Sequence, residues 1–331
     1  MAGYTLAGVT ATLPDDVQHV FHRFITTECT TLDGRGQPIT WPVIPFCRPG
    51  QATIDVTTGL GYPKKARDAR ANPQIGLLFS DPTGSGLDDP PTVLVQGAAE
   101  VDDRDLDANR RRYERESLEK LPATESMMPP RPIRRLFNWY FTRIYVRVRP
   151  ERVYVWPRGD MTAEPQLLGA HMEEVRSGHS REPEHGHANP EGGATAWDDR
   201  IEEMGRRYRT AVLSLVAPDG FPFSVRVPIR PDRRAGLIRI ERAAEGSPLQ
   251  PGLACLTAHD HAPDFSWQRN FQVRGDLIVD EDGWALVPHR LVGGFELPTA
   301  STLARYRLNA SKVRRFRRTA KRELARRADR D

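Results

Sequence analysis

Two phrases of this sequence occur twice, in the same order and at nearly the same separation. Residues 93–103 read VLVQGAAEVDD and return in altered form at 271–281 as FQVRGDLIVDE. Upstream, the Asp-Gly pair at 33–34 is followed by a proline and a valine, and so is the Asp-Gly pair at 219–220. This pattern predicts a tandem duplication. The period is far too long for a solenoid repeat, so each copy should be a domain-sized unit with its own core.

Each copy is rich in short β-strand signals. Stretches with many Thr, Val and Ile are separated by turns that contain Gly, Pro and Asp. We expect strands at 24–32, 39–46, 52–57, 75–79, 92–101, 143–148, 152–156, 210–216, 223–229, 236–241, 254–258, 271–279 and 284–288, with a break at Pro150. We expect helices at 14–22, 63–71, 105–118, 133–140, 197–208 and 311–328. Many short strands and few helices predict an antiparallel barrel or sandwich that occurs twice.

The composition divides the chain into four parts. We expect a first β unit at 1–157, a flexible polar linker at 158–196, a second β unit at 197–300 and a basic C-terminal helix or tail at 301–331. The linker holds four histidines, but no cysteine accompanies them and their spacing is loose. We therefore predict a polar linker there rather than a metal site.

Several classes of protein do not fit this composition. No stretch approaches the roughly 18–20 consecutive apolar residues that cross a membrane, and no signal peptide precedes the first strand. The three cysteines show no CxxC spacing, which argues against a disulfide framework or a zinc site. We expect a cytoplasmic protein without a membrane segment and without a metal.

The C-terminal segment is strongly basic. Residues 303–331 contain 12 Lys or Arg against 3 Asp or Glu, although the net charge of the whole chain is only +4. Contact with nucleic acid or anionic lipid is one interpretation of such a tail. A solvated helix is the interpretation that we favour, because Val313, Phe316, Ala320 and Leu324 recur at helical spacing. We do not expect nucleic acid or a membrane as a partner.

The stretch after the third expected strand carries the sharpest chemical signal. Thr57 and Thr58 end the strand, two glycines follow, and Lys64 and Lys65 open a short basic helix that also contains Arg67. Exposed amides at a helix N-terminus, hydroxyls and fixed positive charge suit a phosphate group. A basic surface helix without a ligand is the alternative interpretation of these residues.

The order of these motifs resembles the pyridoxamine 5′-phosphate oxidase-like superfamily, also called the flavin/deazaflavin oxidoreductase split β-barrel. The matching features are Thr57, Lys64 or Lys65, Asn72-Pro73, the apolar strand 75–79, the Val95-x-Gly97-x-Ala99-x-Val101 phrase and the closing strand 149–156. The resemblance covers about 14–157 well and 205–290 more weakly. It implies a mostly β, α+β fold with two tandem six-stranded split β-barrels, short flanking helices and a degenerate second copy.

The resemblance also implies a function. It points to an oxidoreductase that holds FMN and acts on a small-molecule substrate by hydride transfer, with Thr57, Thr58, Lys64, Lys65, Arg67 and Gly97 as cofactor-binding residues. The alternatives are a reductase that uses the deazaflavin coenzyme F-420, or a protein that binds flavin or haem without catalysis. The residue types assign no catalytic acid or base, because in this superfamily the cofactor carries the redox chemistry.

Two departures from the superfamily pattern narrow the expectation. The second copy has no lysine at 242–248, the stretch that corresponds to the lysine-bearing helix, so we expect one phosphate site per chain. The phrases that mark true pyridoxamine-phosphate oxidases are missing, which argues against vitamin B6 oxidation. We expect either an intramolecular pseudo-dimer of the two copies or a homodimer. His259 and His261 form an HxH pair that we assign to a polar loop.

Overall fold

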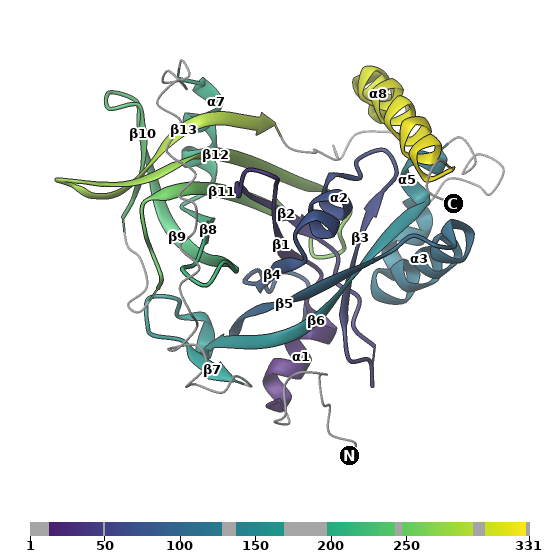
Figure 1. Cartoon of the computed structure of the whole chain (residues 1–331), viewed down its shortest axis with the longest axis horizontal. Helices are drawn as coiled ribbons and strands as arrows, with labels where there is room; N and C mark the ends of the chain where they lie inside the picture. Colours follow the sequence, from purple (N-terminus) through teal and green to yellow (C-terminus); the bar gives the residue numbers. More distant parts are fainter. Residues whose placement is uncertain are drawn as a thin grey trace.

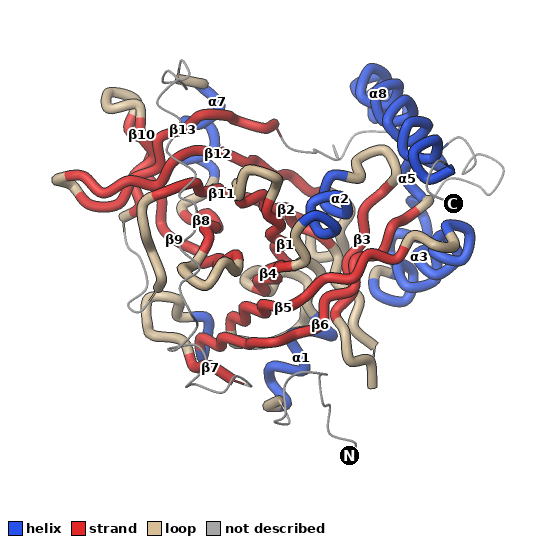
Figure 2. The backbone as a smooth tube through the Cα atoms, in the orientation of Figure 1, coloured by secondary structure: helices blue, strands red, loops and turns tan. Residues whose placement is uncertain are grey.

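The computed structural model describes residues 13–48, 50–127, 137–168, 197–241, 247–293 and 302–328. The chain is mostly β, with strands gathered in two sheets and a few helices around them (Figure 1, Figure 2). The expected fold class, with two barrel-like units and short flanking helices, is confirmed. None of the described helices is both long enough and apolar enough to cross a bilayer.

The first sheet is an open barrel. Its strands are β1 (Thr27–Leu32), β2 (Pro38–Val43), β3 (Ile54–Gly59), β4 (Gln74–Phe79), β5 (Thr92–Asp102), β6 (Arg143–Trp156) and β7 (Gln166–Leu168). They lie in the order β2-β1-β4-β5-β6-β3, and β7 adds to β6. Beyond β2 an isolated bridge joins Phe46 to Asp55 of β3. The two edges of the sheet therefore approach each other without forming a continuous ladder there, as in a split barrel.

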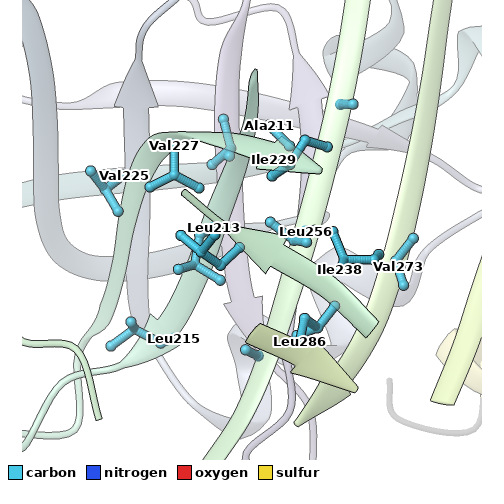
Figure 3. Packing of buried hydrophobic residues seen from close by; sticks show 14 of the residues in the cluster. Ala211, Leu213, Leu215, Val225, Val227, Ile229, Ile238, Leu256, Val273 and Leu286 are labelled. Carbon is cyan, nitrogen blue, oxygen red and sulfur yellow. The ribbon is translucent and has the colours of Figure 1, made fainter. Parts of the chain in front are cut away.

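The second sheet is a closed barrel. Its strands are β8 (Thr210–Val216), β9 (Pro222–Asp232), β10 (Leu237–Ile240), β11 (Gly252–His261), β12 (Gln268–Asp280) and β13 (Gly283–Gly293). The order β9-β8-β11-β12-β13-β10 repeats that of the first six strands, and β9 also pairs with β10. Alternate residues such as Leu213 and Leu215 on β8 point into the interior, where they pack with Leu256 and Leu286 (Figure 3).

The repeated glycines occupy equivalent bulges. The register of β5 against β6 shifts at Gly97, which lies opposite Pro150, and that of β12 against β13 shifts at Gly275, which lies opposite Pro288. A Cβ atom at Gly97 would lie 2.1 Å from the carbonyl oxygen of Arg149, and one at Gly275 would lie 2.0 Å from a carbonyl oxygen of β13. Only glycine permits this close approach of two backbones.

Pro150 does not break the strand, contrary to the expectation from the sequence. β6 runs without interruption from Arg143 to Trp156. The bulge at Gly97 explains the difference, because the local loss of regular pairing accommodates a residue that has no N–H to donate. Part of the expected linker also pairs: Gln166–Leu168 form β7, whereas 169–196 lie outside the described residues.

The two sheets meet through a cluster of buried hydroxyl groups. Thr30 of β1 and Thr40 of β2 lie 2.9 Å apart, as do Thr30 and Ser224 of β9, and Thr40 donates to Ser214 of β8 at 2.7 Å. The pair Ser214–Ser224 is 2.8 Å apart. Each sheet contributes the same two strand positions. The equivalent hairpin turns are 33–36 and 217–220, because Gly36 and Gly220 share positive φ and the same turn hydrogen bond.

Helices flank both sheets. They are α1 (Asp15–Arg23), α2 (Lys64–Ala71), α3 (Leu106–Lys120), α5 (Asn138–Phe141), α7 (Asp199–Arg207) and α8 (Thr302–Ala328), with 3-10 turns η1 (Pro122–Met127) and η3 (Pro157–Gly159). Ala66 and Ala69 pack α2 into the core of the first sheet. The long α8 lies beside α5 (Figure 1).

Candidate functional site

The turn between β3 and α2 is held in one conformation by its own hydrogen bonds. The Thr58 hydroxyl donates to the carbonyl of Tyr62 at 2.7 Å, and the Gly61 amide donates to the carbonyl of Trp139 at 2.9 Å. Pro63 precedes the helix and provides no side-chain cap. The first amides of α2 are therefore left without a capping side chain, as a helix that binds an anion requires.

The two lysines of α2 have different surroundings. Lys64 is half exposed, and its ammonium group lies 2.9 Å from the Asp68 carboxylate and 3.8 Å from that of Asp33. Lys65 turns toward the strand, where its Nζ lies 3.5 Å from the carbonyl oxygen of Thr57. Burial lowers the pKa of Lys65, and the nearby Arg143 lowers it further. Unlike Lys64, Lys65 has no carboxylate within salt-bridge distance in the described part of the chain.

Arg143, which the sequence reasoning missed, provides the second cation. It is 5% exposed and pairs with Gly59 across β6 and β3. Its Nη atoms donate to the hydroxyls of Tyr62 and Tyr113, each at 2.7 Å, and its guanidinium lies 4.2 Å from the ring centre of Tyr140. Its Nε is buried and has no hydrogen-bond partner among the residues that the structure describes.

Within the described residues, neither Lys65 nor Arg143 forms a salt bridge with a carboxylate. Two cations in a partly buried site without a counter-ion, one with an unused buried donor, fit an anionic group such as a phosphate. The signal for Arg143 in the sequence is only its position at the start of β6. Its pairing with Gly59 depends on the sheet and could not be read locally.

Arg67 faces away from this pair. Its guanidinium donates to one oxygen of Glu323 in α8, at 3.1 Å from Nε and 2.7 Å from Nη2. The same helix covers the β3–α2 turn, because the Phe316 ring stacks on Trp139 at 5.0 Å and meets the Tyr62 ring edge-on at 5.8 Å. The structure therefore brings Thr57, Thr58, Lys64 and Lys65 together and places Arg67 on the side of α8.

Gly97 lies in the β5–β6 bulge, between Ile75 and Pro150 on the neighbouring strands. The contact that its Cβ would make with a backbone carbonyl accounts for the glycine without a ligand. Thr57 is partly buried and pairs with Tyr145.

The second sheet places Arg274 near Asp68 of α2, with Arg290 beside it on the next strand. Arg274 and Arg290 face each other across β12 and β13, and neither is paired with a carboxylate in the described part of the chain. Burial lowers the pKa of Arg274, and the charge of Arg290 acts in the same direction, whereas Asp33 and Asp68 oppose both. Arg274 therefore lies within electrostatic reach of the carboxylate that holds Lys64. β12 also contacts β2, where Gln272 donates to the carbonyl of Thr40 at 2.7 Å.

His259 and His261 do not lie in a polar loop, contrary to the sequence-based assignment. Both are buried at the end of β11, against the first sheet. His259 Nε2 lies 2.7 Å from the Glu28 carboxylate, and His261 Nε2 lies 3.2 Å from the Thr26 hydroxyl. Arg226 completes the contact by donating to Glu28 at 2.8 Å. Because Glu28 and Thr26 already contact the Nε2 atoms of the two imidazoles, these nitrogens are not available to ligate a haem iron. The described residues contain no cluster suited to a metal ion.

A separate cavity of about 700 Å³ lies between the β4–β5 loop and η3, at the end of the first sheet. Phe24, Ser80, Asp88, Thr92 and Arg158 contribute to its lining. None of the predicted site residues does.

A scan against known protein families finds no match, and no curated protein matches the sequence. Solved structures match part of the fold. General stress protein 26 from Bacillus anthracis is 15% identical, with 47% of this chain and 97% of that one covered and a TM-score of 0.32. A pyridoxamine 5′-phosphate oxidase-related, FMN binding protein from Nostoc punctiforme is 12% identical, with 44% and 85% covered and a TM-score of 0.32. An F420 reductase is 18% identical, with 43% and 98% covered and a TM-score of 0.32.

Proposed function

We propose that this protein is an oxidoreductase that binds a flavin-type cofactor, FMN, and acts on a small-molecule substrate by hydride transfer. The observation that carries the proposal is the pair of cations at Lys65 and Arg143, which have no carboxylate partner in the described residues. A phosphate beside the start of α2 would supply the missing negative charge. The motif resemblance to flavin-binding split barrels points to the same cofactor.

The residues of the chain would divide the work of binding. Lys65 and Arg143 would neutralise the phosphate, the uncapped amides of α2 would donate to it, and the Thr58–Tyr62 bond would hold the turn in shape. The bound flavin would supply the hydride chemistry. Arg67 would support the site indirectly by fixing α8 through Glu323.

We further propose that the two sheets are duplicated copies that pack as an internal pseudo-dimer. The shared strand order, the equivalent glycine bulges and the hydroxyl cluster between equivalent strand positions support this interpretation. Arg274 and Arg290 would then form the opposite wall of the cofactor groove. The second copy would supply side chains to the site of the first instead of forming a second phosphate site.

Titration of the purified protein with FMN, followed by flavin absorbance and fluorescence, tests the proposal. We expect saturable binding, and a loss of at least tenfold in affinity when Lys64 and Lys65 are both changed to Ala, since a charge-assisted hydrogen bond contributes about 1.5–3 kcal/mol. Lys65→Ala alone should account for most of the loss, because Lys64 is already paired with Asp68. Lys321→Ala, on the exposed face of α8, is the matched control.

The outcomes separate the alternatives. A response to the deazaflavin coenzyme but not to FMN would replace the cofactor, and binding without turnover of any electron donor would indicate a flavin carrier. No response to either cofactor, or equal affinities for wild type and the Lys65 variant, would contradict the phosphate assignment.

A further inference from the structure

The C-terminal helix α8 is fixed to the protein by one face. Phe316 stacks on Trp139, Ala320 is buried, and Glu323 accepts from Arg67. Arg327 closes the same face through its salt bridge to Asp103 at 2.6 Å. Glu323 is the one acidic residue between 302 and 328, and it is 2% exposed. The single acidic side chain between 302 and 328 therefore lies on the inward face of the helix.

The opposite face is a cationic surface. Its exposed basic residues are Arg314, Arg315, Arg317, Arg318, Lys321, Arg322 and Arg326. At about 100° per residue they cover about half of the helix circumference. We call these seven residues the α8 cationic face. Arg314, Arg318 and Arg322 stand at intervals of four residues, about 6 Å of helix rise each, and form one row. None of these three makes an ion pair within the described residues.

We propose that the α8 cationic face binds the phosphate backbone of nucleic acid, an activity that lies beyond the proposed flavin chemistry. Six of its seven residues are arginines, whose planar guanidinium groups donate two parallel hydrogen bonds to a phosphate. The helix is held in place by its inner face, so the row is ordered before the partner arrives. Binding would be independent of base sequence, because phosphate contacts carry no sequence information.

The apolar side of the helix argues against a membrane surface as the partner. An interfacial helix buries its apolar face among the lipids. Here that face is used against the first sheet, and Leu324 is the one large apolar side chain exposed between 313 and 328. Contact with lipid headgroups would therefore depend on charge alone. The sequence alone favoured a solvated helix without a partner. The covered apolar side and the exposed arginines together favour nucleic acid as the partner of this helix.

Fluorescence anisotropy with a short labelled duplex DNA, measured over a range of salt concentrations, tests this inference on the full chain. We expect a dissociation constant of about 10⁻⁴–10⁻⁶ M at physiological salt that weakens steeply as salt is added. The variant with Arg314, Arg318 and Arg322 all changed to Gln should weaken binding at least tenfold. It should also reduce the salt slope by about 3, because each arginine that is removed leaves about one phosphate unneutralised.

The matched control changes Arg115, Arg230 and Arg233 to Gln. These three are exposed arginines on α3, on β9 and just after β9, and their replacement changes the net charge by the same amount. An equal decrease of affinity in both variants would overturn the inference, because net charge rather than α8 would then control binding. Absence of DNA binding by the wild type would also overturn it. So would binding to vesicles of anionic lipid in place of DNA, or to a second copy of the chain.

Discussion

Two guanidinium nitrogens of Arg67 donate to one carboxylate oxygen of Glu323, although 256 residues separate the two residues in the sequence. The carboxylate of Glu323 is 2% exposed, whereas the guanidinium of Arg67 is 40% exposed. This pair fixes the C-terminal helix against α2, next to the turn proposed to bind phosphate. The C-terminal helix therefore packs against the helices that flank the first sheet.

Changing Glu323 to Gln should release this ion pair and leave the shape of the side chain intact. Because the acceptor charge is buried and its partner is partly exposed, we expect the free energy of unfolding to fall by about 1–3 kcal/mol. Urea denaturation measures the change, and faster tryptic cleavage of α8 would show where it acts. Asp107→Asn, on the exposed side of α3, is the control and should stay within about 0.5 kcal/mol of wild type. Equal stability of the Glu323 variant would contradict the role given to the pair.

Gly97→Ala should destabilise the first sheet strongly. Its Cβ would lie 2.1 Å from the carbonyl oxygen of Arg149, so two backbone strands would have to separate. We expect a loss of about 3 kcal/mol or more in the free energy of unfolding. Gly34→Ala provides the control, because nothing lies within 4 Å of a Cβ there and its φ is not positive. Chemical denaturation of both variants makes the comparison. A loss no greater at Gly97 than at Gly34 would contradict the bulge explanation.

Local patterns in the sequence predicted most of the strands and the repeat of Gly97 at Gly275, because both depend on short-range chemistry. The β-bulge at each of these glycines depends on the paired strand and is seen only in the structure. The same patterns placed Leu324 on one face of the terminal helix with Val313, Phe316 and Ala320, but they did not show which part of that face is buried. Leu324 is 48% exposed, and the neighbouring Glu323 is turned inward. Helical spacing cannot reveal that an arginine at position 67 attracts the carboxylate.

The candidate site shows the same limit. Thr57, Thr58, Lys64 and Lys65 are close in sequence and were predicted together. Arg143 reaches the site through strand pairing with Gly59, and Arg274 through packing of the second sheet on the first. Side chains that arrive from distant strands carry no local signal. The buried contact of His259 with Glu28 was missed for the same reason.

Acid should weaken the contact between the sheets through Glu28. Burial alone would raise the pKa of Glu28, but His259, Arg226 and Ser80 together hold it below its ordinary value. A carboxyl group whose folded pKa is lowered stabilises the fold above its unfolded pKa of about 4.3, and that stabilisation disappears as the pH falls through the folded pKa. The stability difference between wild type and Glu28→Gln should therefore shrink below about pH 4.3.

Urea denaturation of both proteins between neutral and acidic pH measures that difference. Glu119→Gln, at an exposed position on α3, is the control and should follow the wild-type curve. Parallel loss of stability in wild type and in the Glu28 variant, with a constant difference at every pH, would show that Glu28 does not stabilise the contact in its charged form.

Arg274 tests whether the second sheet shares the cofactor groove of the first. It is held near Asp33 and Asp68 by the packing of β12, and within the described residues it has no carboxylate partner. If the groove lies between the sheets, Arg274→Gln should weaken FMN binding by about fivefold to tenfold, since a charge-assisted contact of a partly exposed group is worth about 1–1.5 kcal/mol. Flavin fluorescence titration measures the change, with Arg230→Gln on the exposed side of β9 as the control.

The comparison with Lys65→Ala then locates the groove. Loss of affinity in both variants requires a ligand that touches both sheets, because Lys65 and Arg274 belong to different sheets. Loss in the Lys65 variant alone would confine the phosphate to the first sheet, and the second would then act only as a packing partner. Arg274 precedes the bulge glycine of the second sheet, at the position where the first sheet has Gln96, so the outcome also shows whether this difference between the sheets is functional. A loss in the Arg274 variant would mean that the second sheet contributes a cation to the site beside the first.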